Sequence, residues 1–220
     1  MSQPRLVIGN KNYSSWSLRA WLCLRKCNVE FEEVLIPLDT PEFKARIGDY
    51  SPTGRVPVLS HEGRAIWDSL AICEYLNEAF AGGCLWPQDL ASRSLGRCMV
   101  AEMHSGFMAF RSEMPMNCRA LNRRVPMNES LQQDIDRMCS LWTIALADHA
   151  EIGPWLLGEF SIADAMFAPV VMRFRNYGVQ LPAVVQAYCD HVLADEDMQV
   201  WVEQALQETW IVEADEAGSE

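Results

Sequence analysis

The sequence predicts an α/β unit followed by an all-helical unit, and a change in hydrophobic pattern along the chain carries this prediction. Short apolar or alternating runs typical of strands occur only within residues 5–67, whereas helical periodicity alone continues from about residue 90. With 220 residues, 50% of them hydrophobic, the chain can bury two modest cores. We therefore expect a βαβ-ββα domain over residues 1–82 and an all-α domain over residues 90–212.

The first forty residues are predicted to form a strand, a helix and a strand. An apolar run over residues 5–9 and a partly alternating run over residues 29–36 are typical of strands. Between them, Ser14 or Ser15 can cap a helix that has one apolar face and two basic residues at its end, where they complement the helix dipole.

The rest of the first unit reads as a short helix, a hairpin and a longer helix. Proline at the first turn suits a helix over residues 41–47. A Glu-Gly turn between residues 56–60 and 64–67 predicts an antiparallel hairpin. Asp68 or Ser69 then caps a helix that ends before a Gly-Gly pair.

Helices alone are expected after a linker at residues 82–89. Ser161 and Asp164 have capping-box spacing, and we expect Asp164 to stabilise the fold rather than to take part in chemistry. The acidic, small-residue tail over residues 213–220 is expected to be disordered. Apolar stripes predict helices at 95–110 as one long segment, 131–145, 162–174, 183–194 and 197–209.

Composition argues against several classes of partner. A formal net charge of −12 disfavours nucleic acid and anionic lipid, which bind to clustered Lys and Arg. The N-terminal residues lack the pattern of a secretory signal, and no apolar stretch could span a bilayer, so a cytoplasmic location is the default expectation. The eight cysteines include no C-x-x-C pair and no His-rich neighbourhood, so no metal is expected.

Three short segments each carry a different kind of binding group. Residues 12–19, Asn-Tyr-Ser-Ser-Trp-Ser-Leu-Arg, bring hydroxyls to a helix start. Residues 55–57, Arg-Val-Pro, bring a backbone edge beside a proline, and residues 68–69, Asp-Ser, bring a carboxylate and a hydroxyl to a second helix start. These groups together suit a charged, peptide-like thiol.

The S-S-x-S, V-P and D-S motifs, in this order within such a two-domain pattern, resemble the cytosolic glutathione transferases, and the resemblance covers nearly the whole chain. It implies a thioredoxin-like N-terminal domain, glutathione as co-substrate, no metal, a homodimer, and a detoxifying transferase that acts on a small electrophile. The motif is closest to the serine-type classes, particularly zeta. The zeta motif usually has Cys between the serines and Trp just after them, and this chain departs from it with Trp16 and then Ser17 and Leu18.

The resemblance also assigns the glutathione-binding residues. The family's proline, here Pro57, is cis, and the backbone of Val56 would pair with the cysteinyl part of glutathione. Asp68 and Ser69 would receive the γ-glutamyl end, and Arg55 or, less strongly, Lys44 the glycyl carboxylate. Without the resemblance, the proline would only start an edge strand and the Asp-Ser pair would only cap a helix. The two basic residues would be solvated charges.

Ser14 matches the catalytic serine of the serine-type classes, and Ser15 is the alternative. A hydroxyl hydrogen bond to the sulfur, helped by the helix N-terminus, would favour the thiolate of glutathione. From residue type alone, the more common role of both serines is to cap the helix. Arg19 matches the arginine of the family motif, and the resemblance implies that it forms a structural ion pair.

The second substrate is expected against the long helix of the second domain. Several of these residues could equally be core, and His104 could be a packing residue. The expected pocket residues are Trp16, Met103, His104, Phe107, Met108 and Arg111.

The sequence leaves three functions open. The first is a transferase that attacks an apolar electrophile, and the second is a zeta-like maleylacetoacetate isomerase that would need Arg173 or Arg175 for substrate carboxylates. The third is a protein of this fold that binds glutathione without turnover.

Overall fold

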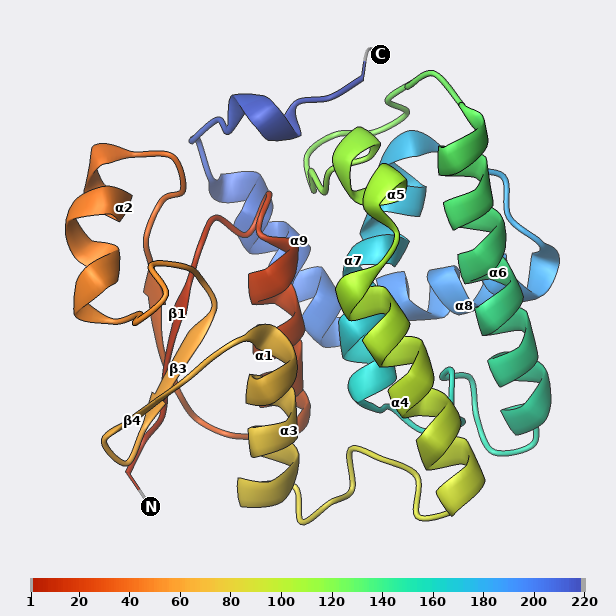
Figure 1. The fold of residues 1–220 in the computed structure, drawn as a ribbon, viewed down its shortest axis with the longest axis horizontal. Helices are drawn as coiled ribbons and strands as arrows, with labels where there is room; N and C mark the ends of the chain where they lie inside the picture. The colour runs from red at the N-terminus through yellow and green to blue at the C-terminus, as the bar shows by residue number, and fades with distance from the viewer. Residues whose placement is uncertain (1, 219–220) are drawn as a thin grey trace.

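The computed structural model describes residues 2–218 and has a four-stranded mixed sheet beside a helical layer (Figure 1). Its N-terminal elements are β1 (Arg5–Ile8), α1 (Ser15–Lys26), β2 (Glu32–Leu35), α2 (Pro41–Arg46), η1 (Ile47–Asp49), β3 (Val58–His61), β4 (Arg64–Ile66) and α3 (Ser69–Ala79). They are followed by α4 (Leu90–Ser105), α5 (Met108–Glu113), α6 (Glu129–His149), α7 (Ile162–Tyr177), α8 (Ala183–Ala194), α9 (Glu196–Gln207) and η2 (Glu213–Asp215).

The sheet has the order β2-β1-β3-β4, with β1 parallel to β2 and antiparallel to β3. Leu6 and Ile8 pack toward α1 and α3, while Val7 packs in a second cluster with Ile36 and Val58. This alternation follows from the two-residue period of a strand that is buried on both faces. The predicted thioredoxin-like βαβ-ββα arrangement, followed by a helical region, is therefore confirmed.

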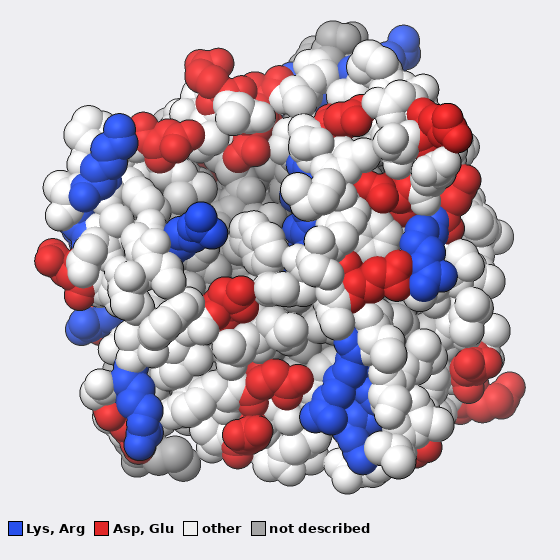
Figure 2. Space-filling model, in the orientation of Figure 1, with Lys and Arg blue, Asp and Glu red and all other residues white. Residues whose placement is uncertain are grey.

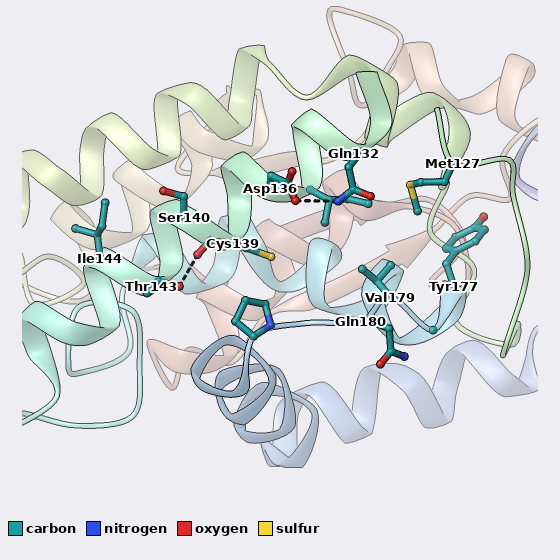
Figure 3. Close-up of a pocket in the computed structure, with 13 residues that line it drawn as sticks. Met127, Gln132, Asp136, Cys139, Ser140, Thr143, Ile144, Tyr177, Val179 and Gln180 are labelled. Carbon is teal, nitrogen blue, oxygen red and sulfur yellow. Dashed lines mark hydrogen bonds between the residues drawn. The ribbon is translucent and has the colours of Figure 1, made fainter. Parts of the chain in front are cut away.

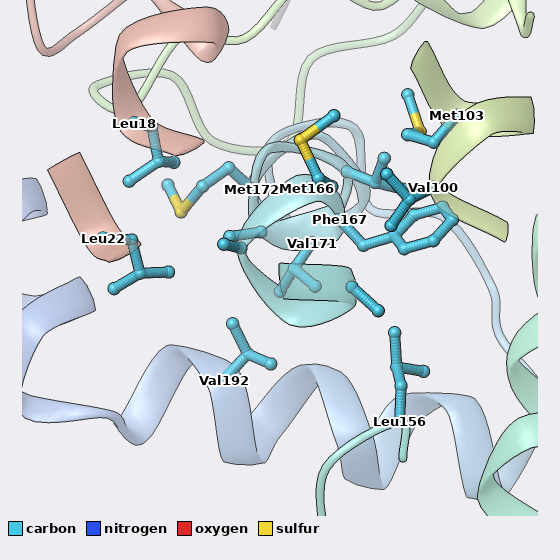
Figure 4. Packing of buried hydrophobic residues seen from close by; sticks show 14 of the residues in the cluster. Leu18, Leu22, Val100, Met103, Leu156, Met166, Phe167, Val171, Met172 and Val192 are labelled. Atoms are coloured by element: carbon cyan, nitrogen blue, oxygen red, sulfur yellow. The ribbon is translucent and has the colours of Figure 1, made fainter. Parts of the chain in front are cut away.

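Helix α7 is the centre of the helical layer, and nearly all its residues are buried. Figure 4 shows Leu18 and Leu22 of α1 beside Met172 and Val171 of α7. The same core therefore joins α1, which begins at the two candidate catalytic serines, to the helical layer. It fixes the position of the α1 N-terminus against α7.

The single long helix predicted over residues 95–110 is wrong. Helix α4 ends at Ser105, and Gly106 and Phe107 leave helical geometry before α5 begins. Phe107 has φ 59°, a left-handed conformation that interrupts the i to i−4 hydrogen bonds. The apolar stripe continues through the break, which is why periodicity alone predicted one helix.

The acidic tail also differs from the expected disordered segment over the residues that the structure describes. Residues 213–215 form the turn η2, and Val212 before it is buried. Glu216 accepts hydrogen bonds from the Tyr13 hydroxyl (2.6 Å), Asn117 Nδ2 (2.9 Å) and Arg123 Nη2 (2.9 Å). The last two residues of this predicted tail lie outside the described part of the chain.

Within residues 2–218, no helix is both long enough and apolar enough to cross a bilayer. The same residues contain no group of three or more His, Cys, Asp or Glu side chains placed to share a metal ion.

Candidate active site

The loop between β1 and α1 is shaped by backbone hydrogen bonds and by a distant carboxylate. The N–H groups of Tyr13 and Ser14 donate to Asn10 O, which bends the loop before the helix. The N–H groups of Lys11 and Asn12 donate to the buried carboxylate of Glu208 at 2.7 and 3.0 Å. Burial raises the pKa of Glu208, and these two donors oppose that shift.

Ser14 and Ser15 are both buried, and their hydroxyl groups have different partners. Ser14 caps α1: its Oγ accepts from Ser17 N at 3.3 Å, and its proton is donated to Ser17 Oγ at 2.7 Å. Ser15 Oγ accepts from Arg173 Nη2 at 3.4 Å. The Ser14 hydroxyl is therefore committed to the helix, whereas the Ser15 hydroxyl keeps its proton available for an acceptor in the adjoining space.

Two adjoining cavities bring the three sequence segments together. The first has a volume of about 430 Å³, and its lining includes Ser14 and Ser15. The second, of about 610 Å³, is lined by Trp16, Thr53, Arg55, Val56, Pro57, Trp67, Asp68, Ser69 and His104. Trp16, Arg55 and Val56 line both cavities. Figure 2 shows the surface hollowed on this side of the molecule, between the α2 region and the α5 region, with charged side chains on the rim.

The predicted glutathione-binding residues all line the larger cavity, apart from Lys44, which lines neither. The Val56-Pro57 peptide bond is cis, as the resemblance implies, and Val56 lies outside the sheet because β3 begins at Val58. Asp68 caps α3, and its Oδ2 lies 3.1 Å from His104 Nε2. Ser69 Oγ is buried and, within the described residues, has no hydrogen-bond partner. A buried hydroxyl without a partner beside a helix start suits a ligand carboxylate.

The residues expected to hold the second substrate separate into three groups. Trp16 and Arg111 line the smaller cavity. Met103 and Phe107 are core residues, and Met108 is 68% exposed, so these three line neither cavity. His104 lies with Asp68 in the larger cavity and meets the Trp16 ring edge at 5.4 Å.

The break between α4 and α5 explains why Met108 lies outside both cavities, whereas Met103 and Phe107 precede the turned segment and are buried in the core. It turns residues 108–113 relative to α4, so a face projected from one continuous helix is incorrect. Sequence reasoning gave no role to the remaining lining residues, of which Tyr13 belongs to the first motif segment and the others carry no local motif: Tyr13, Leu38, Phe43, Gly54, Met116 and Asp215. Arg173, considered only for the isomerase, also lines this cavity, whereas Arg175 does not.

Arg19 and Arg111 lie over the ring of Trp16, and Arg173 lines the smaller cavity that Trp16 also lines. Arg19 is fully buried, stacks on Trp16 at 4.3 Å and donates to Met166 O at 3.1 Å, so it is held by a ring and a carbonyl rather than by the expected ion partner. Burial, and then the charges of Arg111 and Arg173, hold the pKa of Arg19 well below its usual range. Burial likewise lowers the pKa of Arg173 to about 10. The interior of this region is therefore strongly cationic.

A larger hollow of about 760 Å³ lies elsewhere, between α6 and the connection from α7 to α8 (Figure 3). Met127, Gln132, Thr143 and Val179 are among the side chains that line it. None of the residues predicted for glutathione or for catalysis lies there.

Comparison with known proteins finds similarity to glutathione S-transferases. Residues 13–79 match the family model described as glutathione S-transferase, N-terminal domain. Glutathione S-transferase L1 of Arabidopsis thaliana is 25% identical over 199 residues, which cover 84% of this chain and 71% of that protein. A probable maleylacetoacetate isomerase of Caenorhabditis elegans is 26% identical over 184 residues, covering 82% of this chain and 84% of that protein.

A solved structure agrees with the fold. The crystal structure of a glutathione transferase homolog from Burkholderia, with bound glutathione, matches with a TM-score of 0.71 and 24% identity. The match covers 94% of this chain and 100% of that chain. At this identity the structural likeness establishes the arrangement of the elements.

Proposed function

We infer, from the family match and the relatives, that this chain belongs to the glutathione S-transferase family and is a glutathione-dependent enzyme. We propose in particular that it is a serine-type transferase, in which a hydroxyl at the start of α1 stabilises the thiolate of glutathione. The thiolate then attacks a small electrophile held in the smaller cavity, beside Ser15 and Trp16. The convergence of the three segments on two adjoining cavities is the observation that carries this proposal.

The larger cavity suits glutathione at each of its polar ends. The Asp68 carboxylate can attract the α-ammonium group, and the free hydroxyl of buried Ser69 can donate to the γ-glutamyl carboxylate. The backbone of Val56 lies before β3 and can pair with an extended peptide. Arg55 offers a cation for the glycyl carboxylate.

We propose Ser15 as the hydroxyl that contacts the sulfur, and Ser14 as its cap-forming neighbour. A thiol with a pKa near 8.5 is only a few per cent ionised at about pH 7, and each unit of depression is worth about 1.4 kcal/mol. A hydrogen bond to the sulfur at a helix N-terminus supplies about one to two units. The pattern of donors supports Ser15, because the proton of Ser14 already binds Ser17 Oγ.

Titration of the thiolate absorbance of bound glutathione tests this assignment in the wild type, Ser15→Ala and Ser14→Ala. We expect Ser15→Ala to raise the apparent thiol pKa by about one to two units and to slow turnover. We expect Ser14→Ala to lower the free energy of unfolding by about 1 kcal/mol, because the cap is lost, with little change in the thiol pKa. The matched control is Ser112→Ala, since Ser112 is exposed on α5 away from both cavities.

Several outcomes would contradict the proposal. If only Ser14→Ala shifts the thiol pKa, the roles of the two serines are reversed. If neither variant shifts it, serine-assisted ionisation is wrong. If the purified protein neither binds immobilised glutathione nor turns over a broad panel of electrophiles with glutathione, the transferase proposal is wrong. Glutathione binding without turnover, unchanged in Ser14→Ala and Ser15→Ala, would instead support a non-catalytic binding protein.

A second candidate, a glutathione-dependent cis-trans isomerase of the maleylacetoacetate type, is favoured by one relative and one residue. The relative is the probable isomerase of Caenorhabditis elegans, and the residue is Arg173, which lines the smaller cavity with Ser15. Product analysis separates the two reactions, because isomerisation regenerates free glutathione whereas conjugation consumes it.

We also propose a homodimer and a cytoplasmic location for this chain, by analogy with the family. A monomeric mass in solution would contradict the first part of this proposal, and secretion of the protein by its host would contradict the second.

A further inference from the structure

The smaller cavity beside Ser15 is cationic, although the chain as a whole has a formal net charge of −12. Its charged lining consists of Arg55, Arg111, Arg173 and a single carboxylate, Asp215. Positive charge therefore exceeds negative charge in this cavity, in contrast to the chain as a whole. A cavity of this kind favours a negatively charged ligand.

Arg173 is the most deeply placed of these charges and lacks a carboxylate partner. It is 6% exposed, its Nη2 donates to Ser15 Oγ, and its Nε has no hydrogen-bond partner among the described residues. None of the ion pairs within residues 2–218 includes Arg173 or Arg111. Arg111 binds the carbonyl groups of Gly106 and Met103. A buried guanidinium without a carboxylate is costly unless a ligand supplies one.

Asp215 is held at this cavity by its neighbours in the C-terminal turn. Glu216 is fixed by three donors, and Val212 is buried, so the turn is anchored on both sides of Asp215. The Asp215 side chain takes part in no ion pair within 4.0 Å among the described residues. Burial raises the pKa of Asp215 to about 6 despite the opposing attraction of Arg173.

We propose that Asp215 is a charge-selecting residue, a carboxylate built into the C-terminal turn that competes with the carboxylate of a second substrate for Arg173 and Arg111. In the free protein Asp215 supplies part of the negative charge that this end of the cavity favours. A carboxylate ligand enters at the cost of repulsion from Asp215, so the residue limits how tightly the cavity binds anions.

The remaining lining defines the rest of the ligand. Trp16, Leu38, Phe43 and Met116 form apolar walls within a volume of about 430 Å³. Aromatic and sulfur-containing side chains adapt to flat, unsaturated groups. The chemical class that fits is a small aromatic or unsaturated monocarboxylate. The meaning of this subsite for catalysis rests on the proposed transferase function, whereas binding of the carboxylate does not.

Calorimetric titration without glutathione tests the proposal with 4-amino-3-nitrobenzoate and its methyl ester. Neither probe has a leaving group that a thiol could displace, and the two differ only in the carboxylate. We expect Asp215→Asn to tighten binding of the acid about tenfold, which is about 1.4 kcal/mol, and to change binding of the ester less than about twofold. Arg173→Gln should abolish the preference for the acid.

The matched control is Glu213→Gln, which removes the same charge from an exposed position of the same turn. An equal effect of Glu213→Gln and Asp215→Asn would reduce the result to long-range charge and overturn the proposal. Equal affinities for acid and ester in both the wild type and Asp215→Asn, or no binding of either probe, would also overturn it. If Arg173→Gln does not fold, as judged by circular dichroism, Arg111→Gln takes its place and should weaken binding of the acid selectively. Absence of glutathione turnover would leave the binding result interpretable.

Discussion

Replacement of Asp164 by alanine should destabilise the protein far more than loss of an ordinary helix cap. Asp164 is 1% exposed and accepts from Leu156 N at 3.0 Å, Ser161 N at 2.8 Å and the Tyr188 hydroxyl at 3.0 Å. It also completes the capping box of α7. Each buried donor left without an acceptor costs about 1–3 kcal/mol, so leaving three donors without one should cost about 3–9 kcal/mol. That amount is a large part of the about 5–15 kcal/mol by which a typical domain is stable.

Urea unfolding followed by tryptophan fluorescence measures this loss, because Trp142 lies against Tyr188 with ring centroids 5.0 Å apart. Asp89→Ala is the matched control: Asp89 caps α4 through Ala91 N and Ser92 N but is exposed, so its removal should cost about 1 kcal/mol. If Asp164→Ala costs no more than Asp89→Ala, burial does not make the Asp164 network stabilising and the reasoning is refuted.

Three further predictions concern titration, packing and thiol access. Burial raises the pKa of Asp164 to about 6. Proton binding by Asp164 therefore stabilises the folded state fully below about pH 4, and this stabilisation is lost as the pH rises through about 6. In urea titrations, the difference in free energy of unfolding between wild type and Asp164→Asn should be about 1.4 kcal/mol larger at about pH 5 than at about pH 7.5. Gly96→Ala should lower the free energy of unfolding by about 1–3 kcal/mol, because its Cβ would lie 2.6 Å from Leu157 Cδ1; an unchanged urea midpoint would contradict this overlap. Cys84 and Cys98, which are exposed, should react with a thiol reagent before any other cysteine in the native protein, and equal rates for all eight would argue against the described core.

The sequence was sufficient to predict the order of the elements and to select residues that the structure brings together at the larger cavity, because both depend on local signals. Strand alternation, turn residues and helix caps are short-range patterns, and the three motif segments sit at element ends that the fold brings together. The proposed preference for Ser15 over Ser14 was not open to this reasoning, because a sequence does not show that the Ser14 proton is donated to Ser17 Oγ or that Arg173 donates to Ser15 Oγ.

The lining of the smaller cavity could not be predicted for a similar reason. Helical spacing says which residues share a face only while the helix continues, and the left-handed conformation at Phe107 ends that condition. The C-terminal turn was missed because its composition is typical of disorder, whereas its order depends on Tyr13, Asn117 and Arg123, which are distant donors to one carboxylate.

The hydrogen bonds from Lys11 and Asn12 to Glu208 have a consequence for folding during synthesis. The β1-to-α1 loop emerges from the ribosome almost two hundred residues before Glu208, its acceptor, becomes accessible. Until the C-terminal residues arrive, the loop that carries Ser14 and Ser15 has no carboxylate to accept hydrogen bonds from Lys11 N and Asn12 N. Chains released early should therefore lack the hydrogen bonds that shape this loop, and its ordering should be among the last steps of folding.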